Sequence, residues 1–259
     1  MADDLNNEVA KELVAQTAGK AYDDLVAPSA KPIGTVLSLL PRTIRLWLSK
    51  LEKWVLNGEK SLELTAQAIK EKTEKIPIEK LTEPEPYVAI PAMQQLSYSY
   101  DSEELREMYA NLLVASMNLD TKNFVHPSYV DIIKQLSPDE AKLLKFLAAN
   151  SNQPLIDVLL DHPHGGQTTI LHNFTSIGEG VCENPGEIFA YLDNLERLKL
   201  IEIPFGVRIN NDNIYKPLEE HEEIKALINS NVPDGYQYRI ERHKFILSAF
   251  GKNLIKICL

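Results

Sequence analysis

Three histidines close together in the sequence are the side chains best suited to metal chemistry. His162 and His164 lie two residues apart in the stretch Asp161–Gly166, and His172 follows a few residues later. Imidazole nitrogens beside a carboxylate are chemically adequate zinc ligands. A structural zinc site normally has four ligands at recognised spacings, and here Cys182 would have to come from another loop. The proline and glycines of the stretch instead favour a turn between strands, so we predict no metal and no cofactor.

The sequence patterns of common enzyme classes are absent. The chain has no GxxxxGK[ST] phosphate loop, no GxSxG and no HExxH. Glu103, Glu104 and Glu107 share one predicted helix, but no histidine accompanies them, which favours a solvated face over a metal site. We therefore predict that the chain is not an enzyme.

A basic helix, expected from Gly34 to Leu56, is a candidate site for a partner or a membrane. Its apolar residues recur at spacings of three and four, which is typical of a helix that packs on another helix. The two tryptophans of the chain lie seven residues apart and share one face of this helix. Basic amphipathic helices with tryptophans also lie in membrane interfaces, so both interpretations stay open. The candidate residues are Arg42, Arg45, Trp47, Lys50, Lys53 and Trp54.

Basic residues in the C-terminal strand are a candidate site for nucleic-acid contact. Arg239, Arg242 and Lys244 lie in the alternating stretch 236–247. A helix that reads DNA needs arginine or lysine along its length, whereas the predicted helix before this strand, within 184–200, is rich in acids. We therefore do not expect a sequence-specific DNA site.

Composition indicates a globular protein of the reducing cytosol. The chain has 259 residues, 44% of them hydrophobic, and a net charge of −10. This charge opposes non-specific attraction to nucleic acid and anionic lipid, and favours a protein partner. The sequence has only two cysteines, and we find no signal peptide or transmembrane run. We expect a cytoplasmic protein, with peripheral attachment to the inner membrane as the alternative.

The order of predicted elements divides the chain into two regions. Residues 1–136 form a helical module, in which 81–86 is linker-like because it holds two prolines among acids. Residues 137–259 begin with a strong helix start at Ser137-Pro138 and then mix helices with strands. Their order is that of a winged-helix domain with an additional helix inserted near 219–228. The predicted class is thus mainly α, with a helical N-terminal module followed by a winged-helix-like α+β region.

The stretch from Glu83 to Leu136 also resembles the abortive infection alpha family of bacterial proteins. It reads EPEPYVAIPAMQQLSYSYDSEELREMYANLLVASMNLDTKNFVHPSYVDIIKQL, and the likeness extends from about Tyr22 to Leu259, including the ending FILSAFGKNLIKICL. The resemblance implies a role in anti-phage defence by abortive infection, and it supplies no catalytic residues. We expect the chain to act by binding or sensing a host or phage protein. The alternatives are a membrane-directed effector using helix 34–56 and a winged-helix nucleic-acid-binding regulator. A homo-oligomer is compatible with each of these hypotheses.

Overall fold

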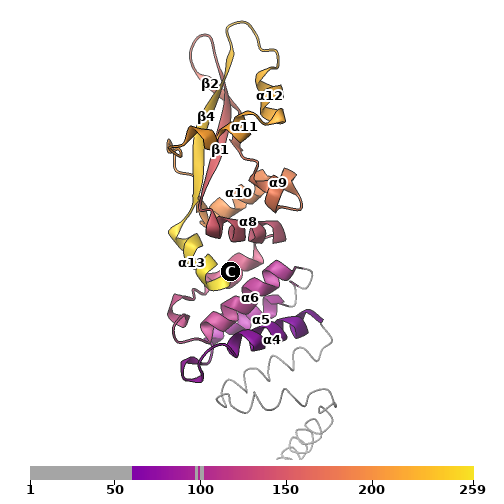
Figure 1. Cartoon of the computed structure of the whole chain (residues 1–259), viewed down its shortest axis with the longest axis vertical. Coiled ribbons are helices and arrows are strands. Elements are labelled where there is room, and N and C mark those ends of the chain that lie inside the picture. The colour runs from indigo at the N-terminus through magenta and orange to yellow at the C-terminus, as the bar shows by residue number, and fades with distance from the viewer. Residues whose placement is uncertain (1–59, 97–98, 100–101) are drawn as a thin grey trace, which may run out of the picture. The chain divides into compact units, whose positions relative to one another are not determined.

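The computed structural model of the chain describes residues 60–96, 99 and 102–259. The helix predicted at Gly34–Leu56, with its six candidate residues from Arg42 to Trp54, lies outside the described residues and stays a prediction. The described residues belong to one compact unit and combine helices with a four-stranded antiparallel sheet (Figure 1). The chain is therefore an α+β protein in which helices dominate, and the prediction is confirmed at that level. None of the described helices is long and apolar enough to cross a membrane.

The described part of the predicted helical module, within residues 60–136, contains four helices. They are α4 (Lys60–Thr73), α5 (Pro86–Leu96), α6 (Glu103–Ser116) and α7 (Ser128–Lys134), with the 3-10 turns η1 (Ile78–Lys80) and η2 (Lys122–Phe124) between them. Ser102 caps α6, because its Oγ accepts a hydrogen bond from Leu105 N at 3.2 Å. Helix α6 packs against α4, α5 and α7, and its Met108 and Leu112 are fully buried. It is the centre of this helical part.

The stretch Leu81–Pro86, predicted to be linker-like, is held against the end of α6. Leu81 forms an isolated β-bridge with Asn118 and is 9% exposed. The backbone N–H of Thr82 donates to Met117 O at 2.8 Å. Pro86 is the first residue of α5, a position where its missing N–H has no intrahelical partner to lose. A stretch with prolines and acids can thus still be fixed by backbone pairing.

The C-terminal helix α13 (Ala249–Cys258) packs back on α6. The side-chain amide of Asn111 on α6 donates to Cys258 O at 3.0 Å, and Leu254 of α13 is fully buried. Helix α6 also contacts α8 (Pro138–Ala149). Residues on both sides of the predicted boundary at 136/137 are therefore in contact, and the division into two domains stays a prediction.

Helix α8 begins with the capping box that the sequence predicts. Glu140 N donates to Ser137 Oγ at 3.2 Å, and Ser137 N donates to a Glu140 carboxylate oxygen. The helix predicted at 185–198 is the 3-10 turn η3 (Pro185–Glu187) followed by α10 (Ile188–Arg197). The short helix α9 (Ile177–Val181) was not predicted, because a five-residue helix leaves almost no periodic pattern in the sequence.

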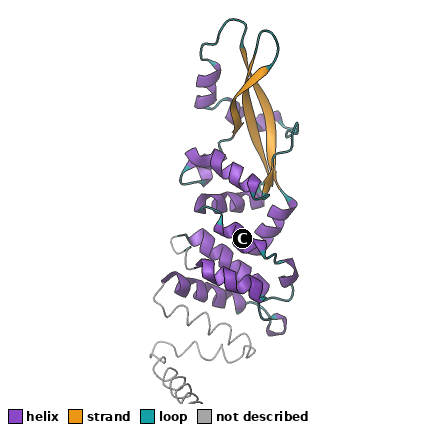
Figure 2. Cartoon of the chain, turned by 180° about the vertical axis from the view of Figure 1, so that it is seen from behind, coloured by secondary structure: helices purple, strands orange, loops and turns teal. Residues whose placement is uncertain are grey.

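The sheet lies in the order β2-β1-β4-β3, with β1 and β4 side by side along most of their length (Figures 1 and 2). Its strands are β1 (Asn152–Asp161), β2 (Gln167–Phe174), β3 (Ile201–Glu202) and β4 (Gln237–Leu247). The sequence predicts strands at 155–160, 168–174, 200–203 and 236–247. Each of them is confirmed, with ends that differ by a few residues. Strand β3 is the shortest because Pro204 follows closely and cannot donate to a ladder.

Where the sequence predicts one helix near 219–228, the structure has two short helices. They are α11 (Lys216–Glu219), preceded by the 3-10 turn η4 (Asp212–Ile214), and α12 (Glu222–Ile228). His221 separates them and caps α12, since its ring accepts a weak hydrogen bond from Glu223 N at 3.4 Å. Both helices cover an apolar cluster on one face of the sheet. The buried members of this cluster are Ile156, Val158, Phe174, Tyr215, Leu218 and Ile224.

Candidate binding site

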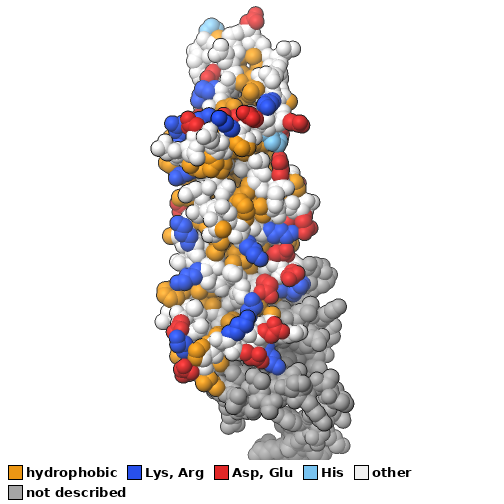
Figure 3. Space-filling view, in the orientation of Figure 1, with side chains coloured by type: hydrophobic (Ala, Val, Ile, Leu, Met, Phe, Trp, Pro, Cys, Tyr) orange, Lys and Arg blue, Asp and Glu red, His pale blue; other side chains and the backbone are white. Residues whose placement is uncertain are grey.

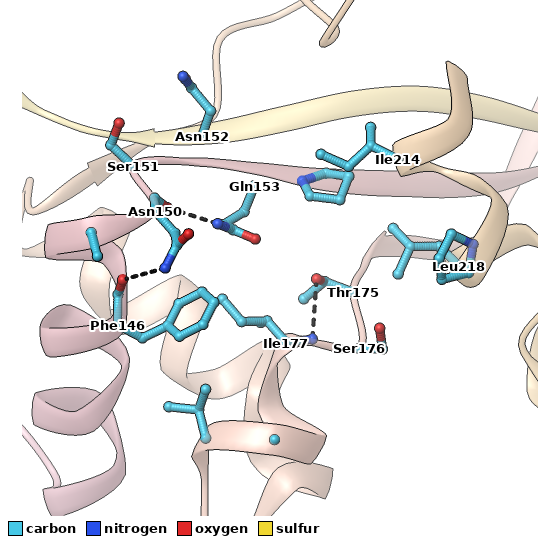
Figure 4. A pocket seen from close by; sticks show the side chains of 15 residues that line it. Phe146, Asn150, Ser151, Asn152, Gln153, Thr175, Ser176, Ile177, Ile214 and Leu218 are labelled. Atoms are coloured by element: carbon cyan, nitrogen blue, oxygen red, sulfur yellow. Dashed lines mark hydrogen bonds between the residues drawn. The ribbon is translucent and has the colours of Figure 1, made fainter. Parts of the chain in front are cut away.

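An open pocket of about 740 Å³ lies where the end of α8 and the start of β1 meet α9 and α11. Phe146 and Ile177 are on the helical side, and Asn150 and Gln153 lie across from them (Figure 4). Gln153 Nε2 donates to Asn150 O at 2.7 Å, which holds this amide in place (Figure 4). No carboxylate, imidazole, amine or thiol side chain is among the lining residues. The pocket can thus accept and donate hydrogen bonds to a neutral polar group, but it holds no side chain that exchanges protons near neutral pH.

A second hollow, the β4 groove, has a volume of about 1060 Å³ and runs beside Tyr236–Arg242. Its walls come from the loop after β3, from α11 and from the chain that follows α12. The apolar lining residues are Ile228, Val232, Tyr236, Tyr238 and Ile240, and the charged ones are Arg208, Glu219, Glu241 and Arg242. The β4 groove therefore mixes apolar side chains with polar ones, and its acids and arginines are equal in number.

Two of the three basic residues predicted to contact nucleic acid are already paired with acids. Arg239 Nε lies 2.9 Å from Asp161 Oδ2. Arg242 Nε lies 2.6 Å from Glu219 Oε1, and its Nη1 lies 3.0 Å from Asp212 Oδ1. The carboxylate hydrogen bonds raise the pKa of both guanidinium groups. A phosphate would have to compete with these carboxylates.

The third residue, Lys244, lies on β4 opposite Pro154 of β1. Basic and acidic side chains are interspersed on the face shown in Figure 3, so that face carries no continuous basic surface. Such a distribution suits contact with a protein better than contact with a phosphate backbone.

The histidine stretch forms the predicted turn, which joins β1 to β2. His162 N donates to Gly166 O at 3.1 Å, and His162 Nε2 lies 2.8 Å from Thr168 Oγ1. His164 is exposed at the turn. His172 instead lies farther along β2, where its Nδ1 is 2.9 Å from Asp157 Oδ2. No group of three or more His, Cys, Asp or Glu side chains in the described ranges is arranged to hold a metal ion.

Two buried carboxylates organise the structure and were missed from the sequence. Asp157 on β1 is 7% exposed, and its Oδ1 accepts a hydrogen bond from Asn173 N at 2.8 Å. Its other oxygen lies 3.5 Å from His243 Nε2. Asp157 sits at the irregularity in the β1–β2 register between Ile156 and Val158. An acid within the apolar run Leu155–Leu160 was the available signal, because a buried charge needs partners.

The second buried carboxylate, Asp139 on α8, anchors the loop before α10. It is 4% exposed, and its two oxygens accept the backbone N–H groups of Glu183 and Asn184, each at 2.9 Å. The hydroxyl of Tyr191 donates to the same side chain at 3.2 Å. Asp139 is at the second position of α8, where the sequence suggested only a helix-start acid.

Neither cysteine is poised to act as a nucleophile. Burial raises the pKa of the Cys182 thiol to about 11, and the charge of nearby Asp139 acts in the same direction. Burial also raises the pKa of Cys258 well above its ordinary value. Both thiols are therefore protonated near neutral pH, which makes them weak nucleophiles.

These features define a helix-rich α+β protein with two open hollows in its described part. The chain belongs to the abortive infection alpha family, whose sequence model matches residues 57–258. The resemblance found in the sequence is thereby confirmed. None of the curated proteins compared with the chain matches it.

One solved structure is similar to part of the chain, at low sequence identity. It is described as the uncharacterized protein from the hydrocarbon-degrading marine bacterium Alcanivorax borkumensis SK2. The similarity covers 54% of this chain and 94% of that one, with 18% sequence identity and a TM-score of 0.35. At these values the likeness carries no argument about fold or function.

Proposed function

We propose that this protein serves phage defence by binding another protein, and that it does not catalyse a reaction. Membership of the abortive infection alpha family supports the defence role. The observation that carries the binding mode is the β4 groove, in which apolar and polar side chains are mixed and the charges balance. Interfaces between non-obligate protein partners show a similar mixture of apolar and polar surface. The uncharged pocket beside α8 and the protonated cysteines add support, because neither provides acid–base or nucleophilic chemistry.

We also propose that the C-terminal region is a modified winged helix. The order α8, β1, α9, α10, β3, β4, with β4 between β1 and β3, is compatible with that topology. Strand β2 and the segment 203–236 would then be additions to it. In a DNA-binding winged helix, α10 would enter the major groove. Here one side of α10 is buried at Leu192 and Leu195. The guanidinium of Arg197 donates to Asn194 Oδ1 and Gln135 Oε1. Both observations favour a packing role for α10.

We predict that the protein has no tight, sequence-specific site on duplex DNA. Arg239 and Arg242 are engaged by carboxylates, and the whole chain has a net charge of −10. A randomised duplex library incubated with the protein at physiological salt should show only weak attachment that disappears as salt is raised. Enrichment of one defined motif with submicromolar affinity would contradict this prediction and favour the regulator hypothesis.

The defence role is tested by phage challenge. A susceptible bacterial host that expresses the chain should form at least about tenfold fewer plaques with one or more members of a diverse phage panel. The matched control is the same host with the gene interrupted by an early stop codon. Equal plaque numbers across the whole panel would argue against the defence role. We further propose a cytoplasmic location, with the membrane-directed alternative resting only on the sequence of residues 34–56.

A further inference from the structure

Among the residues that the structure describes, strand β4 has an edge without a strand partner over most of its length. On one side it pairs with β1 from Gln237 to Ile246, but on the other side β3 reaches only Ile246 and Leu247. Continuing the β3 ladder would place Pro204 opposite Lys244, where proline has no N–H to donate. The chain turns away there, with Val207 N donating to Pro204 O at 3.3 Å and Gly206 at a φ of +67°. Pro204 and the left-handed Gly206 thus end the β3 ladder, and no other described strand pairs with this edge of β4.

Alternation along the ladder identifies the backbone groups at this edge. Leu247 N donates to Ser151 O, which continues the β1–β4 register, while Ser248 N donates to Leu200 O on the opposite side. In an antiparallel ladder, alternate residues direct their N–H and C=O to opposite neighbours. Tyr238, Ile240 and Arg242 therefore direct theirs away from β1 and toward the β4 groove. Pro154 fits this assignment, because it lies opposite Lys244 at a position that exchanges no hydrogen bond with β4.

The β4 groove lies beside this edge, since Tyr238, Ile240 and Arg242 are among its lining residues. A strand paired with β4 would place alternate side chains next to Tyr238 and Ile240, which pack with the apolar cluster under α11 and α12. The intervening side chains would lie near Arg239 and Glu241, which are paired with each other at 3.6 Å. The loop after β3, α11 and the chain that follows α12 also line the groove, so a single segment has easier access to it than the edge of another sheet.

An exposed aromatic residue lies next to the β4 groove. The side chain of Phe205 is 99% exposed and lies in the turn beside Gly206 of the groove wall. A fully exposed phenylalanine beside a groove is typical of an interaction surface, since aromatic side chains are enriched among the residues that dominate binding energy at interfaces.

We propose that the β4 groove binds an extended segment of a partner protein, which adds a strand to the free edge of β4. This inference rests on the proposed protein-binding function and names the kind of partner. The segment has apolar side chains at alternate positions and polar ones between them. Backbone hydrogen bonds to Tyr238, Ile240 and Arg242 hold it, as in other cases of strand addition. The partner segment needs no net charge, because the acids and arginines that line the groove are equal in number.

A random dodecapeptide library displayed on ribosomes tests the proposal. Peptides that bind the full chain should share alternating apolar residues, and synthetic copies should bind it in solution. N-methylation should weaken binding about tenfold at peptide residues whose N–H faces β4, and far less at the residues between them. Methylation removes the donor from the peptide alone, so this readout does not depend on the stability of a protein variant.

Two proline variants locate the binding edge. Ile240→Pro removes an N–H that points into the β4 groove and should weaken peptide binding at least about tenfold. Thr169→Pro is the matched control, because it removes an N–H on the outer edge of β2, away from the groove, and should leave binding unchanged. Val232→Glu, which introduces a charge into the groove wall, replaces Ile240→Pro as the test if circular dichroism shows that the proline variant is unfolded.

The proposal is overturned if no peptides are recovered, if Ile240→Pro and Val232→Glu bind as the wild type does, or if Thr169→Pro abolishes binding. It is also overturned if methylation at every peptide position has the same effect. The defence role fails separately, when the wild-type protein binds peptides but protects cells against no phage. Protection without any peptide binding would instead reject the β4 groove and leave the defence role standing.

Discussion

Gly251→Ala is expected to reduce the free energy of unfolding by about 3 kcal/mol or more. Gly251 is buried in the first turn of α13, where its N–H donates to Ser248 Oγ at 2.8 Å. A Cβ atom added there would lie 2.1 Å from Leu200 O. This carbonyl cannot easily move, because it accepts a hydrogen bond from Ser248 N at 3.0 Å. Either α13 shifts away from the start of β3 or the variant fails to fold.

Urea unfolding followed by circular dichroism measures the effect of this substitution. Gly180→Ala is the matched control, since Gly180 is exposed in α9 and an added Cβ would meet nothing within 4 Å. That change should be neutral or stabilising by up to about 1 kcal/mol, because alanine is the better helix former. If Gly251→Ala is as stable as Gly180→Ala, the close packing of α13 on Leu200 is wrong.

Asp139→Ala should cost about 3–5 kcal/mol of the free energy of unfolding, because it leaves buried donors without an acceptor. The side chain accepts the backbone N–H groups of Glu183 and Asn184 and the hydroxyl of Tyr191, and Lys142 Nζ lies 3.5 Å from it. Together these groups fix the loop that leads into α10. Lys142→Met is a useful comparison, since it removes only the partly exposed cation and should cost far less.

The same carboxylate makes stability depend on acid pH. Burial alone would raise the pKa of Asp139, but the hydrogen bonds from Glu183, Asn184 and Tyr191, with the charge of Lys142, together hold it below the ordinary value of 3.8. A carboxyl whose pKa is lowered by folding stabilises the protein fully above its unfolded value. That contribution is lost as pH falls through the lower, folded value.

Asp139→Asn should therefore show a weaker loss of stability than the wild type between pH 5 and the acid limit of about pH 2. Urea unfolding at a series of pH values, run in parallel on both proteins, gives the two slopes. Parallel slopes would show that other carboxyl groups carry the acid sensitivity and that Asp139 contributes none.

Local signals in the sequence predicted the helix starts and the strands well. Ser137 caps α8 as expected, because a cap is a short-range interaction between a side chain and the next turn. The alternation in 236–247 likewise predicted β4 within one residue at its start. Helix α9 and the break at His221 escaped prediction, because each spans too few residues to leave a pattern.

The candidate site was harder to predict, because its features depend on contacts between distant residues. Arg239 and Arg242 looked free in the sequence, yet their carboxylate partners Asp161 and Glu219 come from other elements. The β4 groove depends on where β3 stops, and Pro204 was a signal that the sequence did contain. The sequence did not show which edge of β4 lies beside Pro204. That became clear only from the structure, in which β1 pairs with the opposite edge.

The link between the β4 groove and phage defence is tested by the efficiency of plating on cells that express equal amounts of wild-type, Ile240→Pro or Thr169→Pro protein. We predict that wild-type and Thr169→Pro protein reduce plaque numbers at least about tenfold for the same phages, and that folded Ile240→Pro protein gives no reduction. The loss is expected because three backbone positions of β4 provide the hydrogen bonds that hold the partner segment. Protection by Ile240→Pro equal to that of the wild type would contradict this account of how the protein works.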